Sequence, residues 1–189
     1  MADQYNTVEE IIADLQAAVA AAMSSVAQAI QDTLRSHIES DVYAKYTSEV
    51  YPRKGTLLSG VDNANISADG NSVTVTYEPN GAVSGTWAEM PEPIRRKYGM
   101  WDDDPIKPNP VSGDALIRRI ETGQGYDYKF KQGGGPGARP FLTNTVNELI
   151  EGKRALTAFI DAFNGYSSRL QAQDIGSEIF RDGNDFGGF

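Results

Sequence analysis

A chain of 189 residues, 40% of them hydrophobic, can build one medium-sized domain with a core and is too short for two large domains. It has no cysteine, which excludes disulfide scaffolds, cysteine-ligated zinc and thiol catalysis, and fits a reducing cytoplasm. The formal net charge of -9 repels nucleic acid, so a groove that tracks phosphates is not expected. The N-terminus lacks the basic start and apolar stretch of a signal peptide, and no run of about 18 apolar residues occurs, so we expect a soluble chain without membrane contact.

The first forty residues predict one long amphipathic helix, because apolar residues recur at steps of three and four: Val8, Ile12, Leu15, Val19, Met23, Val26, Ile30, Leu34 and Ile38. Thr7 and Glu10 have the spacing of a capping box, which predicts the helix start. A helix unbroken to about residue 39 would run roughly 48 Å, so part of it is expected to meet something outside its own domain. The spacing drifts from a seven-residue repeat, which favours packing on a sheet or on neighbouring subunits over a dimeric coiled coil.

An alternation of period two follows and predicts a strand hairpin. Residues 65–67 and 72–77 form the two strands, joined across Asp69 and Gly70, which suit the positive φ of a tight turn. The side chains expected to face the core are Val73, Val75 and Tyr77. Residues 79–113 then break all periodicity with several prolines and both tryptophans, which predicts an inserted loop with aromatic anchors.

The C-terminal half predicts two more helices and one strand. The first helix runs from residue 113 or 114 to 121, and the strand covers residues 126–130. The last helix runs from about Thr143 to Phe163, and Gly165 is placed to end it.

These elements predict an α+β fold with a long N-terminal helix, a small and mainly antiparallel sheet packed by helices, a C-terminal helix and an extended arm. Residues 1–165 would form a single domain that carries the loop insertion 79–113, and residues 166–189 would form the C-terminal arm.

Three features could carry chemistry, and each has a simpler explanation. The glycines of 133–137 lack the lysine followed by serine or threonine that a phosphate loop needs, which favours a surface loop. The aspartates 102–104 are consecutive, so their side chains diverge, and they lack the alternate spacing of a calcium loop. His37 is the single histidine, and a helix-surface or boundary position explains it better than a catalytic triad. We therefore expect no enzyme, no cofactor and no metal.

Three short motifs resemble the head-tail neck and tail-completion family of long-tailed bacteriophages, which includes minor capsid and tail-terminator-like proteins. In that family a tyrosine-rich segment ends near an arginine and a leucine pair, matched here by Tyr43, Tyr46, Tyr51, Arg53, Leu57 and Leu58. An Ile-Glu-x-Gly element matches Ile120, Glu121 and Gly123, and an Arg-Pro-Phe step before the last helix matches Arg139, Pro140 and Phe141. The resemblance covers about residues 37–164. The chain departs from the pattern in the length of 79–113 and in its tail past residue 165.

This resemblance implies a structural virion protein that forms a ring, a hexamer, at the head-tail junction after assembly in the host cytoplasm. The ring would complete or terminate the tail tube and join it to the head. Its partners would be the tail tube protein and a head-closure or portal adaptor protein, and DNA would pass through without specific binding. Two alternatives stay open: a head-closure or portal adaptor role, and an assembly chaperone or binding module that does not remain in the particle.

A closed ring needs two different adhesive faces on each subunit, so more apolar anchors than one core requires are expected. The candidate assembly interface comprises Tyr51, Arg53, Arg139, Pro140, Phe141, Ile179, Phe180, Phe186 and Phe189. Acidic residues on the long helix fit a conduit that repels phosphates, since residues 1–41 contain one basic residue, Arg35, against Asp3, Glu9, Glu10, Asp14, Asp32, Glu39 and Asp41.

Overall fold

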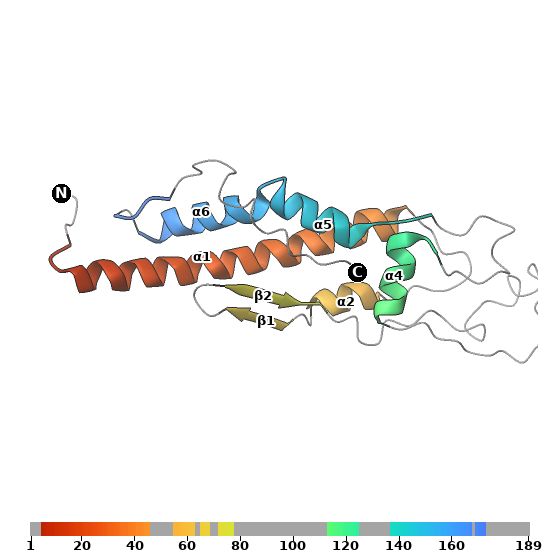
Figure 1. Ribbon diagram of the computed structural model, residues 1–189, viewed down its shortest axis with the longest axis horizontal. Coiled ribbons are helices and arrows are strands. Elements are labelled where there is room, and N and C mark those ends of the chain that lie inside the picture. The colour runs from red at the N-terminus through yellow and green to blue at the C-terminus, as the bar shows by residue number, and fades with distance from the viewer. Residues whose placement is uncertain are drawn as a thin grey trace, which may run out of the picture.

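The computed structural model is an elongated body organised along one long helix (Figure 1). This helix, α1 (Val8–His37), runs directly into a π-helix, η1 (Ile38–Ala44). The long N-terminal helix predicted from the apolar spacing is therefore confirmed, and it continues past residue 39 in a wider form. The structure describes seven stretches of the chain, the third of them by its backbone alone: residues 5–45, 55–62, 65–68, 72–77, 113–124, 137–167 and 169–172.

Two residues fix the start of α1, as the sequence predicts. The Glu10 backbone nitrogen donates a hydrogen bond to the Thr7 hydroxyl at 3.2 Å, and the Asn6 backbone nitrogen donates one to the Glu10 carboxylate at 2.8 Å. The Glu10 donor would otherwise lack a partner in the first helical turn, and the Asn6 donor lies just before the cap. The capping box is thus confirmed, with the return bond coming from Asn6 instead of Thr7.

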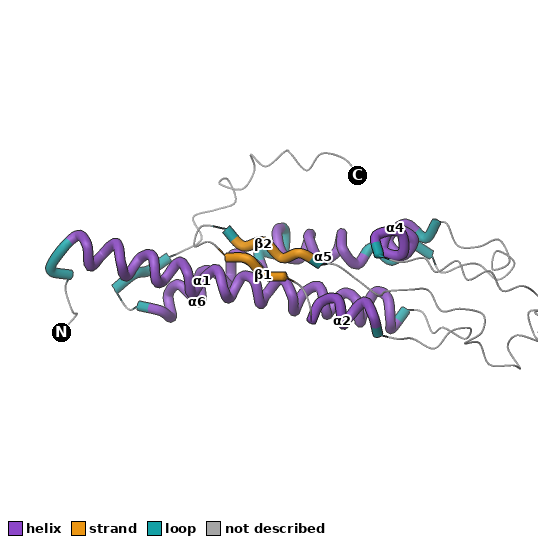
Figure 2. Tube along the Cα trace, turned by 90° about the horizontal axis from the view of Figure 1, so that it is seen from below, coloured by secondary structure: helices purple, strands orange, loops and turns teal. Residues whose placement is uncertain are grey.

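The other helices lie around α1. Helices α5 (Phe141–Ile150) and α6 (Arg154–Tyr166) run along one side of it, and α2 (Thr56–Asp62) lies on the other side (Figure 1). Helix α4 (Asp114–Thr122) crosses the body steeply at the end where η1 lies. The perpendicular view in Figure 2 shows α2 and α4 at this same end of the molecule.

Strands β1 (Asn65–Ala68) and β2 (Val73–Thr76) form an antiparallel hairpin on the α2 side of α1 (Figure 1). Ile66 pairs with Val75, and in β2 half-buried residues alternate with exposed ones, as the period-two pattern predicts. The hairpin is therefore confirmed, with boundaries within one residue of those expected.

The predicted α+β class is confirmed only in part. The described part of the chain is mostly helical, and within it β1 and β2 pair with each other alone, so a small sheet packed by helices is not confirmed. Period-two alternation predicts that a strand forms, but it does not predict how many strands join it. The predicted strand 126–130, the insertion 79–113 except Gly113, and the arm from residue 173 onward lie outside the described residues.

Two apolar clusters hold the body together. The main core joins α1, η1, α2, α4 and α5 and contains Leu34, Ile38, Val42, Leu57, Val61, Ile120 and Phe141. Tyr77 packs against it, as predicted, and its hydroxyl donates a hydrogen bond to the Leu57 carbonyl at 3.0 Å. The second core lies between α1 and α6 and consists of Ala18, Ala22 and Phe163, with Phe159 stacked on Phe163. Small residues on α1 allow α6 to approach closely there.

The sequence predicted one unbroken helix from about Thr143 to Phe163. This prediction is wrong, because two helices meet at residues 151–153. The backbone nitrogens of Glu151 and Gly152 both donate to the Asn147 carbonyl, and Lys153 has a left-handed φ of 56°. A Cβ on Gly152 would lie 2.5 Å from the Glu148 carbonyl oxygen, so glycine permits this tight end. The apolar spacing continues across the break, so periodicity alone predicted one helix. Gly152 was the local signal for the helix end.

By length and composition, the continuous helix of α1 and η1 (Val8–Ala44) could cross a membrane. The core helix of a globular domain meets the same test, so length and composition are weak grounds for a membrane span. Here α5, α6, α2 and the hairpin all pack against this helix. Part of its apolar face therefore already has partners within the chain.

Candidate functional site at the junction of α1, α4 and α5

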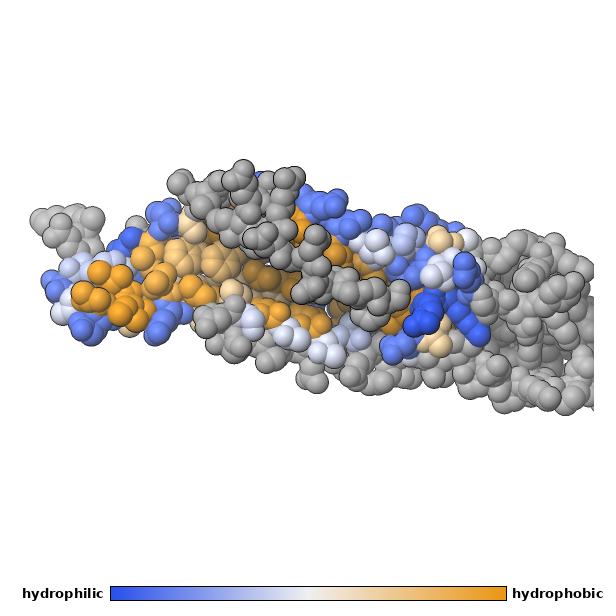
Figure 3. Space-filling model, in the orientation of Figure 1, coloured by the Kyte–Doolittle hydropathy of each residue, from blue (hydrophilic) through white to orange (hydrophobic). Residues whose placement is uncertain are grey.

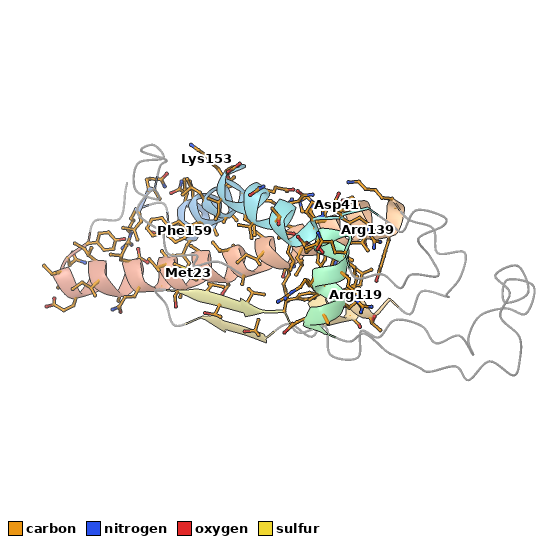
Figure 4. All side chains as sticks on the ribbon, turned by 45° about the vertical axis from the view of Figure 1, so that its right-hand side comes forward. Met23, Asp41, Arg119, Arg139, Lys153 and Phe159 are labelled. Carbon is orange, nitrogen blue, oxygen red and sulfur yellow. The ribbon has the colours of Figure 1, made fainter. Side chains whose placement is uncertain are left out.

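Two of the motifs noted in the sequence meet in space where α4 ends and α5 begins. The Arg139 backbone nitrogen donates a hydrogen bond to the Ile120 carbonyl at 2.9 Å, which lays residues 137–140 against the end of α4. Ile120 and Phe141 are both buried in the main core. Figure 4 shows Arg119 and Arg139 at this junction, with Asp41 of η1 close by. The Ile-Glu-x-Gly and Arg-Pro-Phe motifs thus form one structural unit.

Gly123 makes this approach possible. It ends α4 with a left-handed φ of 67°, and its backbone nitrogen donates to the Arg119 carbonyl at 2.9 Å. A Cβ at this position would lie 2.5 Å from the backbone nitrogen of Ala138. At this distance any side chain would force the backbone to shift. Both the conformation and the close contact therefore require glycine.

Glu121 caps the start of α5 from a different helix. Its carboxylate accepts a hydrogen bond from the Leu142 backbone nitrogen at 2.6 Å and another from the Thr143 hydroxyl at 3.1 Å. A negative charge at a helix N-terminus satisfies unpaired donors and interacts favourably with the helix dipole. The cap ties the end of α4 to the start of α5.

Replacing Glu121 with alanine is expected to lower the free energy of unfolding by about 1–2 kcal/mol, because it removes a charge-assisted helix cap. Urea unfolding followed by circular dichroism measures this loss. Glu151→Ala serves as the control, because Glu151 is an exposed carboxylate just after α5 and its removal is expected to change stability by less than about 0.5 kcal/mol. Equal losses in the two variants would contradict the capping role.

A polar cluster centred on Asp41 joins η1 to α5. The buried Asp41 carboxylate accepts hydrogen bonds from Asn144 at 2.8 Å, from Lys45 at 3.0 Å and from the Nδ1 side of His37 at 2.8 Å. His37 Nε2 lies 2.9 Å from a carboxylate oxygen of Glu148, which also pairs with Arg154. We call these six residues the Asp41 cluster. Local π-helical geometry, as in η1, is often found where a side chain has a special role.

The geometry of His37 limits the chemistry of this cluster. Both ring nitrogens face carboxylate oxygens, and both contacts are good hydrogen bonds only when both nitrogens carry a proton. Each ring nitrogen therefore already has a carboxylate partner, and the two contacts join α1 to η1 and to α5. Within the described stretches, no group of His, Asp and Glu side chains is arranged to hold a metal ion.

The surroundings of Asp41 stabilise its charged form. Burial raises the pKa of the Asp41 carboxyl, but the hydrogen bonds from Asn144, Lys45 and His37 outweigh burial and bring the pKa down to about 2. The hydrogen bond from Arg154, together with that from His37, lowers the pKa of Glu148 despite partial desolvation. A carboxyl group whose pKa is lower in the folded chain than in the unfolded chain stabilises the fold while it is charged.

The contribution of Asp41 is expected to depend on pH. It is complete above the unfolded pKa of about 3.9 and is lost as the pH falls toward 2, the pKa in the folded chain. Asp41→Asn should therefore cost about 1–2 kcal/mol at pH 7, after discounting for solvent screening, and progressively less as the pH falls from about 4 to 2. Urea unfolding at each pH measures the difference. Asp161→Asn, which changes an exposed carboxylate of α6, is the control and should cost less than about 0.5 kcal/mol at pH 7. A cost of Asp41→Asn that does not change with pH would contradict the assignment.

A shallow groove of about 590 Å³ lies between α1 and the turn that joins α5 to α6. It is open to solvent, and charged side chains of both signs line it, among them Asp32, Arg154 and Asp161. Sites for small molecules are usually enclosed and mostly apolar, with a few polar groups that converge on the ligand. This groove is open instead of enclosed, and we do not assign it a ligand.

The structure places three residues of the predicted assembly interface. Phe141 is fully buried and Arg139 is 8% exposed, while Pro140 between them is half-buried. These three residues act within the chain's own core and junction, and their predicted contact with a partner stays a prediction. The other predicted interface residues lie outside the described residues: Tyr51, Arg53, Ile179, Phe180, Phe186 and Phe189.

Sequence reasoning missed the Asp41 cluster and the Glu121 cap. The steps of four from His37 to Asp41 and from Asp41 to Lys45 were a visible local signal for one helical face. The contacts with Asn144 and Glu148 join residues more than one hundred positions apart, and no local pattern predicts them. His37 is half-buried between two helices, so the expected boundary position is correct and its carboxylate partners are new.

Comparison with known proteins places the chain in a family. The family model described as YomN matches residues 6–165. A protein of Bacillus subtilis (strain 168), described as "SPbeta prophage-derived uncharacterized protein YomN", is 30% identical over 131 residues, which cover 69% of this chain and 70% of the relative. No solved structure matches the chain. A neck or tail-completion family is not shown by these matches. The chain belongs to the YomN family, and it is related to a prophage-derived protein.

Proposed function

We propose that the chain is a structural virion protein, without enzymatic activity, that forms a ring at the head-tail junction of a long-tailed phage. The ring completes or terminates the tail tube, joins it to the head and leaves a channel for DNA. The relation to a prophage-derived protein supports a phage origin. The motif resemblance supports the place in the particle, and a hexamer is the expected copy number.

The observation that carries the proposal is the presence of two separate apolar surfaces on one elongated body. At the N-terminal end of α1, Val8 and Ile12 are 63% and 49% exposed. On α5, Val146 and Ile150 are 50% and 58% exposed and lie one turn apart. Exposed apolar patches commonly mark sites of protein contact. Two different patches on one chain are what a heterologous interface needs, and such an interface closes into a ring when its rotation allows.

The charge of the chain agrees with a conduit for DNA. The net charge is -9, and Glu9, Glu10 and Asp14 lie on the first turns of α1. A negative lumen would repel phosphates and keep DNA from adhering during passage. Many acidic proteins have no such role, so charge gives slight support.

Deletion of the gene in the phage that encodes the chain tests the proposal. We expect filled heads separate from tails, with some tails of abnormal length, and rescue by the wild-type gene supplied in trans. Heads that leak their DNA would indicate the portal adaptor role instead. A chain that is needed for assembly but absent from particles would indicate a chaperone. Normal tails attached to normal heads would contradict all three roles.

A matched pair of variants tests the α5 surface in the same rescue assay. Ile150→Asp places a charge in the exposed apolar pair and is expected to rescue poorly while the chain remains folded. Asn147→Asp adds the same charge at an exposed polar position of the same helix and is expected to rescue like the wild type. Equal rescue by both variants would exclude this surface from assembly.

A further inference from the structure

The N-terminal end of α1 exposes a strip of four large apolar side chains. Val8, Ile11, Ile12 and Leu15 are between 40% and 63% exposed. Their spacing places them on one face of the helix. Figure 3 shows hydrophobic surface gathered at this end of the molecule. We call these four residues the α1 tip.

The α1 tip is exposed because α6, which covers the next part of this face, ends before it reaches the tip. Farther along α1, Ala18 and Ala22 are buried by Phe163 of α6. Helix α6 ends at Tyr166, and Ala172 lies back beside Asn164 of that helix. Ser167 donates a hydrogen bond to Asp14 at 3.0 Å, and Ala172 packs against the second core. The chain thus passes beside the tip and leaves it uncovered.

The position of Ala172 shows where the remaining chain begins. Its backbone nitrogen and oxygen make two hydrogen bonds with the Asn164 side chain, at 2.6 Å and 2.9 Å. From Ser167 to Ala172 the chain runs from the level of Asp14 to that of Ala18 and Ala22, away from the α1 tip. To cover its own tip, the segment that begins at residue 173 would have to turn back toward the N-terminal end of α1.

The remaining segment, residues 173–189, has the composition and reach to contact another molecule. It carries five large apolar side chains: Ile175, Ile179, Phe180, Phe186 and Phe189. Fully extended, it can span up to about 55–60 Å, which exceeds the roughly 45 Å length of α1. The segment and the tip region both carry acidic residues, so apolar contact and not charge attraction would hold them together.

We propose that residues 173–189 of one copy dock on the α1 tip of a neighbouring copy. This inference rests on the proposed ring and names the contact that joins its subunits. The donor segment and the acceptor tip are different surfaces of the same chain, so the contact is heterologous and passes from each subunit to the next. The apolar side chains of the segment cover the strip that α6 leaves open.

The absence of cysteine allows a direct test with two single-cysteine proteins. Ile12→Cys and Phe180→Cys are purified separately with tags of different mass, mixed under assembly conditions and oxidised. We expect a disulfide-linked dimer that contains one molecule of each. Because the two cysteines are on different molecules, docking within one chain cannot give this product.

The control replaces Ala13, an exposed residue adjacent to Ile12 but turned about 100° around the helix. Docking is expected to give about tenfold more mixed dimer with Ile12→Cys than with Ala13→Cys, because it raises the local concentration of the two thiols. Equal yields would overturn the proposal. So would a disulfide that forms only within the double variant Ile12→Cys/Phe180→Cys, since that result places the segment on its own tip.

Sedimentation of the wild-type chain under the same conditions separates this inference from the proposed function. A wild-type chain that stays monomeric would count against the ring itself. Rings that form without the mixed dimer would overturn the docking contact alone. A chain ending at Gln173 is expected to lose ring formation and to keep the thermal unfolding of its monomer.

Discussion

Replacing Phe141 with alanine is expected to lower the free energy of unfolding by about 3–5 kcal/mol, the usual cost of removing a buried phenylalanine ring. Phe141 has no exposed surface and is the largest fully buried side chain among the described residues. It is part of the main core with Ile38, Val42 and Ile120, so one cavity would loosen η1, α4 and α5 together. Urea unfolding followed by circular dichroism measures the loss.

Val146→Ala is the control for this variant, because Val146 belongs to the same helix and is 50% exposed. Its replacement removes less buried surface and is expected to cost less than about 1 kcal/mol. Similar losses in the two variants would contradict the packing described here. The result also bears on assembly, because any defect that Phe141→Ala causes in assembly would act through the subunit's own fold.

Replacing Gly123 with alanine is expected to cost about 2–4 kcal/mol, from a strained left-handed conformation and a clash with the backbone. The new Cβ would lie 2.5 Å from the Ala138 nitrogen, so residues 137–140 must move away from α4. We expect the Arg139 amide, which bonds to the Ile120 carbonyl, to lose protection from hydrogen exchange. Thermal unfolding and amide exchange measure the two effects.

Gly55→Ala separates conformation from contact. Gly55 has a similar φ of 69°, but a Cβ there would have nothing within 4 Å. Its replacement is expected to cost about 1–2 kcal/mol from the backbone alone. If Gly123→Ala costs no more than Gly55→Ala, the close approach of α4 to residues 137–140 is not tight enough to require glycine.

Local patterns predicted the elements whose stability depends on neighbours in sequence. The spacing of apolar residues and the Thr7 cap predicted α1, and the alternation from Val73 to Thr76 predicted β2. Helix α4 was predicted within one residue of its observed end. In each case the residues that carry the pattern belong to the predicted element or directly flank it.

The elements that sequence did not predict depend on distant partners. The π-helical form of η1 surrounds Asp41, whose partner Asn144 lies 103 positions away. Helix α2 is short and contains Gly60, so its apolar pattern is too brief to identify. The Ile-Glu-x-Gly and Arg-Pro-Phe motifs were visible, but their contact depends on the absence of a side chain at Gly123.

The candidate interface shows the same division. Resemblance selected Arg139, Pro140 and Phe141, and the structure places all three at the α4–α5 junction. Val8, Ile12 and Leu15 of the α1 tip were part of the predicted helical face, but exposure cannot be read from periodicity. Only packing shows which part of an apolar face remains open.

Locating the chain in assembled particles tests the central claim most directly. Gradient-purified particles of the phage that encodes it are labelled with gold-conjugated antibody against the chain and viewed by electron microscopy. The proposed ring predicts label at the junction between head and tail, and no label at that junction on particles from the deletion strain. Particles with attached tails that carry no label at the junction, with the chain recovered only from the unassembled fraction of the lysate, would contradict a structural role in the neck.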